Sequence, residues 1–250
     1  MLGVKNLELS LQHGTILMFK NKSINCVIPA RMSSSRFHGK PLAKIHGREM
    51  ILRVAEIASL SAYVDRVIVA TEDPIIQRTC EIHGYESMLT DKHYTCTHRV
   101  AEVADRIKSD YVFNLQGDEP LTRVSWIDDM ISHGVANDYD MVQASRKLEE
   151  GELDDEDVVK MIENNNRVMH MQRTPDVVCS NITVQLGLYF YRHDVIKNFP
   201  NLDMTFVKYW KGLDTIGFCG RYNVIPFDLE CGKIRAVDRP EHIKEVEDNL

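Results

Sequence analysis

A cluster of cationic and hydroxyl side chains directly follows the first strongly apolar segment of the chain, residues 24–30. The cluster contains Arg31, Arg36 and Lys40, with serines at positions 33–35 and a glycine at position 39. Arginine offers a planar fork of donors and lysine a point charge, while serines beside a glycine turn bring short donors close to a ligand. The loop is therefore suited to bind several anionic oxygens, such as those of a triphosphate. Its spacing is not that of the Walker loop, and a solvated basic turn is the alternative.

Two carboxylates occupy similar positions after apolar segments. Asp118 follows residues 111–115 within the run Gln116–Pro120, and Asp238 follows residues 233–237, which we expect to form a short strand. Magnesium is usually held by one or two carboxylates together with phosphate oxygens, so Asp118 is placed to hold Mg²⁺ on a bound triphosphate. A purely structural role in a turn is the alternative for Asp118. Asp238 either caps the last helix or completes the metal site.

Two arginines follow segments that resemble strands. Arg173 comes after residues 167–172, and Arg192 comes after residues 183–191. A guanidinium group binds carboxylates well, so either arginine is a candidate to receive the carboxylate of an acidic substrate.

Alternating strand and helix patterns in the first half must position these groups. We expect strands at 24–30, 66–71, 85–89 and 111–115, separated by helices at 49–62, 74–83 and 97–108. This order predicts an α/β fold with a mainly parallel, mixed central sheet and helices on both faces. Ligands of such sheets bind beyond the carboxyl ends of the strands, so the cationic loop and the Asp118 turn should face one crevice.

The second half is less regular. The acidic run 148–157 is interpreted as a solvated surface loop, and residues 158–163 and 167–172 as a hairpin around three asparagines. We expect a further buried strand at 183–191 and a final helix at 240–249. Residues 1–23 are interpreted as an extension, poorly ordered over 1–17, before a single domain at 24–250 that carries a small β-rich appendage.

Composition excludes several classes of protein. The net charge of −7 argues against a nucleic-acid partner, because no basic face dominates. No apolar stretch is long enough for membrane insertion. The six cysteines form no C-x-x-C pair, which favours reduced thiols and a cytoplasmic location.

Four motifs together resemble those of a known family. They are P-A-R-x-x-S-x-R-x-x-G-K-P-L at 29–42, A-T-[DE]-D at 70–73, Q-G-D-E-P at 116–120 and V-D-x-P-E at 237–241. In this order the chain resembles the sugar-acid cytidylyltransferases, in particular the 3-deoxy-manno-octulosonate (Kdo) cytidylyltransferase, or CMP-Kdo synthetase, family. The resemblance implies a nucleotide-diphospho-sugar transferase fold of the glycosyltransferase-A type, usually a homodimer, and Mg²⁺-dependent transfer of CMP from CTP to the anomeric hydroxyl of an acidic 2-keto sugar.

The resemblance also implies roles for individual residues. The catalytic groups would be Arg31, Arg36, Lys40 and Asp118, and magnesium would lie on Asp118 and Asp238. The nucleotide would be bound by Arg31, Ser34, Lys40, Thr71, Thr95 and Arg99. The acceptor sugar would be bound by Gln116, Arg173, Gln185 and Tyr189, with residues 146–192 including a hairpin on the acceptor side or at the dimer interface.

The triphosphate and metal groups are retained, and the departure in their loop is mild, because the family's L-P-G-K is Phe37-His38-Gly39-Lys40 here. The other departures lie elsewhere. The family's G-T-[DE]-R is Cys96-Thr97-His98-Arg99 here, Gln185 replaces a histidine before L-G-[IL]-Y, and the glutamate-rich helix is not recognisable in 205–218. The acceptor is therefore expected to be Kdo, a modified Kdo such as an amino-substituted form, or another acidic sugar. Transfer to a different phosphate or phosphonate acceptor, and a catalytically silent nucleotide-binding protein, are the alternatives.

Overall fold

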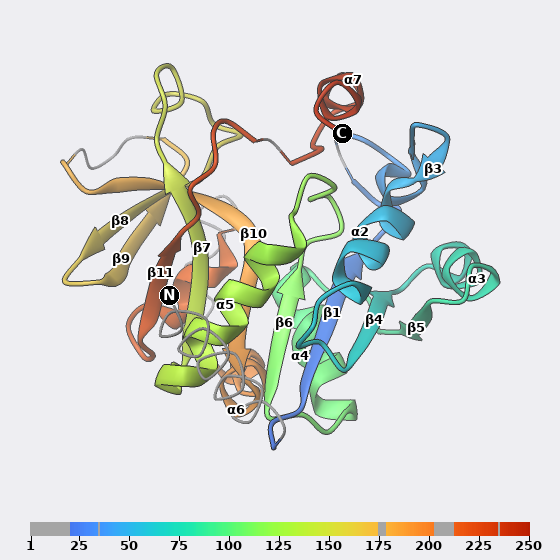
Figure 1. Cartoon of the computed structure of the whole chain (residues 1–250), viewed down its shortest axis with the longest axis horizontal. Coiled ribbons are helices and arrows are strands. Elements are labelled where there is room, and N and C mark those ends of the chain that lie inside the picture. The colour runs from blue at the N-terminus through green and yellow to red at the C-terminus, as the bar shows by residue number, and fades with distance from the viewer. Residues whose placement is uncertain (1–20, 35, 175–178, 203–212, 235) are drawn as a thin grey trace, which may run out of the picture.

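The computed structural model describes residues 21–34, 36–174, 179–202, 213–234 and 236–250. The segment 1–17, for which poor order was expected, lies outside these residues, as does most of 205–218. The described part contains one large mixed sheet flanked by helices (Figure 1). None of its helices is long and apolar enough to cross a membrane.

Seven strands form the main path of the sheet. In spatial order the strands are β11 (Val224–Asp228), β7 (Met141–Lys147), β10 (Ile182–Arg192), β6 (Tyr111–Leu115), β1 (Ile24–Ala30), β4 (Arg66–Thr71) and β5 (Glu86–Leu89). Strands β1, β4, β5 and β6 run parallel, β11 is parallel to β7, and β10 is antiparallel to both of its neighbours on this path, β6 and β7.

Alternation along the strands builds one core on each face of the sheet. In β1, Cys26 and Ile28 pack into the core that contains α2 and α5, whereas Val27 between them packs into the core that contains α4 and α6. Figure 1 shows α2 and α5 lying over the same face. The helices are α2 (Met50–Ser59), α3 (Pro74–Ile82), α4 (Cys96–Arg106), α5 (Val124–Asn137), α6 (His193–Lys197) and α7 (His242–Glu247). The fold class predicted from the sequence is confirmed.

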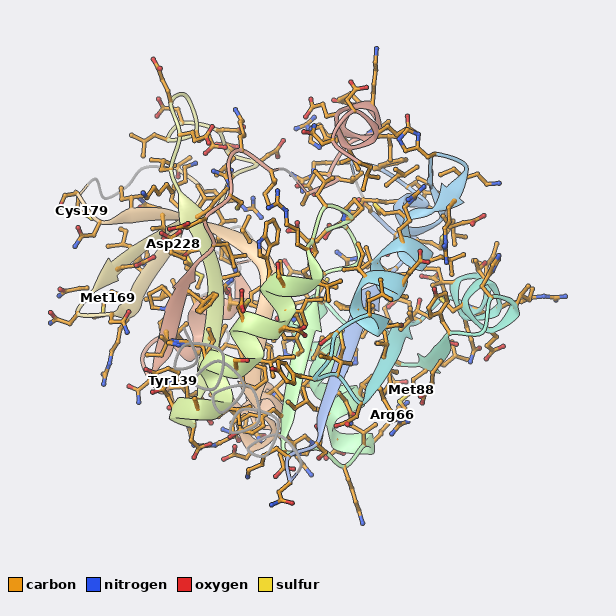
Figure 2. All side chains as sticks on the ribbon, in the orientation of Figure 1. Arg66, Met88, Tyr139, Met169, Cys179 and Asp228 are labelled. Atoms are coloured by element: carbon orange, nitrogen blue, oxygen red, sulfur yellow. The ribbon has the colours of Figure 1, made fainter. Side chains whose placement is uncertain are left out.

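A hairpin forms the β-rich appendage. Strands β8 (Lys160–Asn164) and β9 (Arg167–Gln172) pair with each other, β8 also pairs with β10, and the hairpin projects from one side of the sheet (Figure 1). Asn165 and Asn166 have φ values of 50° and 58°, the left-handed conformation that asparagine tolerates in a two-residue turn. The predicted hairpin is confirmed. Met169 on β9 is 55% exposed and points outward (Figure 2).

The strand predicted at 233–237 is wrong, because none of the described residues in this range is in a strand. The backbone N–H of Val237 instead donates to the carbonyl of Asp118 at 2.9 Å. The segment thus reaches the turn after β6 rather than extending the sheet.

Candidate functional site

Two adjoining cavities lie at the carboxyl ends of β1 and β6. Their volumes are about 970 and about 520 Å³. Both are lined by Arg31 from the cationic loop, Gln116 and Asp118 from the turn after β6, and Asp238 from the segment before α7. The structure therefore brings the cationic loop and the Asp118 turn to one crevice, as the strand order predicts.

The cationic loop is closed at its base by backbone contacts. Gly39 has a φ of 73° and donates its N–H to the carbonyl of Met32 at 3.0 Å, and the Met32 N–H donates to Asp73 Oδ2 at 2.7 Å. A glycine is favoured at such a positive φ. Ser34 lines the smaller cavity, and its Oγ accepts from the Phe37 N–H at 3.3 Å. These bonds hold Ser34 beside Arg36 and Lys40 at the same cavity.

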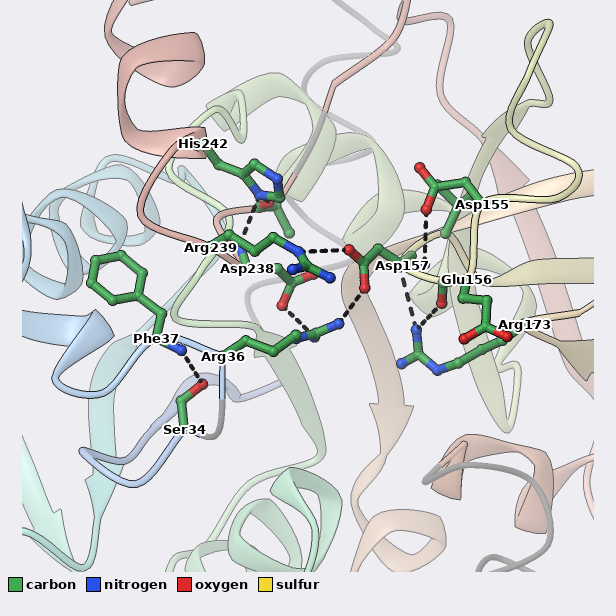
Figure 3. A network of polar contacts seen from close by, with 12 residues as sticks. Ser34, Arg36, Phe37, Asp155, Glu156, Asp157, Arg173, Asp238, Arg239 and His242 are labelled. Carbon is green, nitrogen blue, oxygen red and sulfur yellow. Dashed lines mark hydrogen bonds and ion pairs between the residues drawn. The ribbon is translucent and has the colours of Figure 1, made fainter.

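Two cations of the loop, Arg36 and Lys40, are paired with three carboxylates, and Figure 3 shows the two pairs of Arg36. Arg36 donates to Asp157 at 2.5 Å and to Asp238 at 2.8 Å. Lys40 forms an ion pair with Asp118, and its Nζ lies 3.6 Å from Asp238 Oδ1. Burial lowers the pKa of Lys40, but the charges of Asp118 and Asp238 outweigh burial and raise the pKa overall. Lys40 is therefore a firmly charged ammonium between two acids.

Asp238 does not cap the last helix, because α7 begins later and Glu241 is its N-cap residue. Its side chain instead bonds to the two cations described above. The interpretation of Asp238 as a helix cap is therefore wrong. Its carboxylate lies on one side of the Lys40 ammonium, and that of Asp118 lies on the other.

The guanidinium group of Arg173 also lines both cavities, as do those of Arg31 and Arg36. It donates to the backbone carbonyl of Glu156 at 3.0 Å and lies 3.5 Å from that of Asp157. Burial, followed by the charge of Arg36, lowers the pKa of Arg173. The positive charges of Arg36 and Arg173 repel each other, and an anionic ligand between them would relieve this repulsion.

Strand β10 carries two of the four residues predicted for the acceptor. Gln185 and Tyr189 line the larger cavity, on either side of a bulge where the register with β7 shifts. The N–H of Gly187 in the bulge donates to Glu119 at 2.8 Å, and its carbonyl accepts from the N–H of Gln116 at 2.8 Å. The bulge therefore connects β10 directly to the Asp118 turn. Bulges near active sites commonly redirect side chains in this way.

Of three further residues predicted for the nucleotide, one lines the larger cavity and two line neither cavity. Thr95 lines the larger cavity and also caps α4, because its Oγ1 accepts from the His98 N–H at 3.3 Å. Thr71 is buried, and its Oγ1 accepts from the N–H of Asp73. Arg99 is buried and paired with Glu72. The nucleotide contacts expected for these three residues stay predictions.

The other arginine considered for the acceptor carboxylate lies elsewhere. Arg192, at the far end of β10, pairs with Asp140 and Asp194 and lines neither cavity. Because β10 runs antiparallel to β6, its last residue lies beside Tyr111, at the edge opposite the crevice.

Several groups that build this site are not evident from the sequence. The acidic run 148–157 is not fully solvated as expected, because Glu152 is buried in a two-bond ion pair with the equally buried Arg146 at 2.7 Å per bond. Lys160 is also buried and donates to three backbone carbonyls, including that of Asp155. These anchors position Asp157 against Arg36. The sequence gives no clear signal for this pair, because Arg146 lies in a segment where Gln143, Ser145 and Lys147 are also polar.

Comparison with known proteins gives consistent matches over most of the chain. A family model described as cytidylyltransferase matches residues 25–216. A 3-deoxy-manno-octulosonate cytidylyltransferase from Neisseria meningitidis is 35% identical over 199 residues, covering 72% of this chain and 78% of the relative. One from Thermodesulfovibrio yellowstonii is 31% identical over 245 residues, covering 89% and 96%.

Solved structures agree with this similarity. The structure of a CMP:2-keto-3-deoxy-manno-octonic acid synthetase complexed with CTP superposes with a TM-score of 0.83 at 28% identity, covering 91% of this chain and 98% of that one. A putative glucose-1-phosphate thymidylyltransferase from Bacillus anthracis, at 12% identity, has a TM-score of 0.69 and covers 91% and 96%, which shows the fold alone.

Proposed function

The chain belongs to the cytidylyltransferase family, and we propose that it transfers CMP from CTP to the anomeric hydroxyl of Kdo or a closely related 2-keto sugar acid, releasing pyrophosphate. The observation that carries this proposal is the crevice where Arg36 and Lys40 face Asp118 and Asp238 beside the acceptor strand. Cations for a triphosphate and acids for a metal are thereby gathered at one edge of the sheet.

The cationic loop would bind the triphosphate. Arg31, Arg36 and Lys40 line the smaller cavity together with Ser34, so phosphate oxygens entering it would replace the carboxylates that now pair with Arg36 and Lys40. The charge that grows on the departing pyrophosphate would then lie against fixed cations. Such preorganised stabilisation, with in-line positioning, supplies most of the catalysis in phosphoryl-type transfers.

The two acids fit a magnesium ion. Asp118 and Asp238 already converge on one cation, the Lys40 ammonium, and carboxylate oxygens are the ligands that Mg²⁺ prefers. No cluster of three or more potential metal ligands occurs among the residues that the structure describes, so phosphate oxygens and water would complete the coordination. Bound Mg²⁺ would supply charge neutralisation on the triphosphate.

The acceptor would bind along β10. Arg173 would receive the sugar carboxylate, and Gln116, Gln185 and Tyr189 would contact its hydroxyl groups at the larger cavity. Burial raises the pKa of Tyr189 well above its usual value, so this residue acts as a neutral hydroxyl. The polar lining suits a sugar acid.

Pyrophosphate release provides the test. The protein is given CTP and Mg²⁺ with Kdo, 8-amino-Kdo or sialic acid as acceptor, and release with Kdo or 8-amino-Kdo is the expected result. Asp118→Asn should reduce kcat at least about 100-fold, while Asp129→Asn, at an exposed aspartate on α5, should retain full activity. Tight CTP binding without release for any acceptor would overturn the proposed transfer, as would full activity of Asp118→Asn.

We further propose a cytoplasmic homodimer. Exposed Met169 on the projecting hairpin is an apolar side chain available to a second copy. Light scattering coupled to size exclusion tests the assembly, and a monomer at micromolar concentration would contradict it.

A further inference from the structure

The side-chain amide of Gln143 is completely buried and fills the bulge of β10. Gln185 pairs with Ser145 and Tyr189 pairs with Gln143, so residues 186–188 lie opposite Ala144 alone. The backbone carbonyls in this irregular stretch need donors, because buried acceptors without partners are costly. Gln143 Nε2 shares its two N–H donors among three carbonyls, those of Leu186 at 2.9 Å and Leu188 at 3.4 Å in this stretch and that of Ala144 on β7 at 3.0 Å.

These contacts settle the orientation of the Gln143 amide. Only its NH₂ group can face three carbonyl oxygens, since the reverse orientation would set oxygen against oxygen. Gln143 Oε1 is consequently turned toward Gln185, whose Nε2 lies 3.2 Å away. Gln143 Oε1 can only accept, so Gln185 must present its own NH₂ to it.

The orientation of Gln143 thereby determines that of Gln185 at the cavity wall. Gln185 Nε2 is also within reach of Tyr189 Oη at 3.0 Å and of Thr215 Oγ1 at 3.3 Å. Both hydroxyl groups could rotate to suit either orientation of the amide, whereas Gln143 cannot. With its nitrogen directed to these protein groups, Gln185 has its Oε1 left for the larger cavity, which it lines.

We propose that Gln143 is a positioning residue that fixes the hydrogen-bonding polarity of the acceptor pocket, so that Gln185 offers an acceptor oxygen and the site selects a sugar acid presenting a hydroxyl or amino donor there. This inference rests on the proposed function, because it concerns the acceptor of that reaction. A site built to bond a donor discriminates strongly against an analogue that lacks it, since the buried oxygen is then left unpaired.

The first test measures selectivity with Kdo and its 4-, 5-, 7- and 8-deoxy analogues. In the wild type, deletion of one hydroxyl should lower kcat/KM about tenfold or more. In Gln185→Met, removal of the same hydroxyl should leave kcat/KM at the value that this variant shows with Kdo. The KM for CTP should equal that of the wild type. Gln143→Met should lose the same preference, whereas Gln77→Met on α3 serves as the matched control. Deletion costs that persist at all four positions in Gln185→Met would overturn the proposal.

The second test does not depend on turnover. Hydrogen exchange of ¹⁵N-labelled side-chain amides, assigned through the Met variants, should show Gln143 exchanging about 100-fold more slowly than Gln77, in the wild type and in Gln185→Met. If the side-chain amide of Gln143 exchanged as fast as that of Gln77, the proposal that Gln143 is held in one orientation would be overturned. If the wild type transfers CMP to none of the sugars, the proposed function fails, and the exchange rates still decide whether Gln143 is held.

Discussion

Replacing Glu119 by glutamine should make the protein more stable at neutral pH. Glu119 is buried in the turn after β6, and its Oε1 accepts from the Gly187 N–H at 2.8 Å. Burial and the neighbouring charge of Asp118 raise its pKa to about 8, although the Gly187 bond and the Lys40 ammonium act in the opposite direction and Asp238 raises it further. The fold therefore holds Glu119 in its neutral form.

The contribution of Glu119 to the free energy of unfolding changes with pH, because its pKa differs between the folded and unfolded states. The pKa of Glu119 is about 8 in the folded protein and 4.5 for a free glutamate. The stabilisation from the neutral form is thus fully present below pH 4.5 and is lost as the pH rises to 8, because the unfolded chain releases its proton first. At about 1.36 kcal/mol per pH unit, the loss reaches about 3 kcal/mol by pH 7. Glutamine keeps the oxygen that accepts from Gly187 and does not titrate.

Urea unfolding of metal-free protein, between pH 4.5 and 8, measures the effect. The difference in unfolding free energy between Glu119→Gln and the wild type should widen by about 3 kcal/mol from pH 4.5 to pH 7, in favour of the variant. Glu81→Gln, at an exposed position on α3, should show no such trend. A difference that is constant with pH, or that favours the wild type as the pH rises, would refute the assignment of a neutral Glu119.

Two further variants test the acidic segment 148–157. Glu152→Ala leaves the Arg146 guanidinium buried without a counter-charge, so the unfolding free energy should fall by about 3–5 kcal/mol in urea titrations; a loss below about 1 kcal/mol would contradict the buried pair. Asp157→Asn removes a carboxylate that competes with phosphate for Arg36, so calorimetry should show CTP binding up to about fivefold more tightly. Weaker binding would mean that Asp157 supports the nucleotide site instead of competing with it.

Local patterns predicted the elements whose partners are close in the chain or dictated by strand order. Strand β4 coincides with the predicted range 66–71, and the asparagine turn of the hairpin has the expected positive φ values. The shared crevice also followed, because parallel strands place their carboxyl ends at one edge. For these three features, the residues that determine the structure are close in the chain or follow from the order of the strands.

The remaining features depend on partners that are distant in the chain. A charged run looks the same whether it is solvated or, like Glu152, paired with a buried arginine. The segment before α7 was expected to be a strand, yet the N–H of Val237 bonds to the carbonyl of Asp118, which lies far earlier in the chain. No periodicity marks the bulge of β10 either, because what stabilises it is the side chain of Gln143 on another strand.

The two halves of the site are held by different parts of the fold, so residues on β10 can depart from the family pattern while the cationic loop keeps its groups. The cationic loop is tied to Asp73 and to its own backbone, and no hydrogen bond joins its described residues to the bulge. Gln185 instead depends on Gln143 and on the bulge geometry, so it can vary while the triphosphate groups stay in place. The bulge still bonds to the Asp118 turn through Gly187, where a Cβ would lie 2.6 Å from Glu119 Oε1. Under the proposed function, acceptor specificity can therefore change through side chains on β10, whereas the backbone at Gly187 is constrained by its contact with Glu119 in the Asp118 turn.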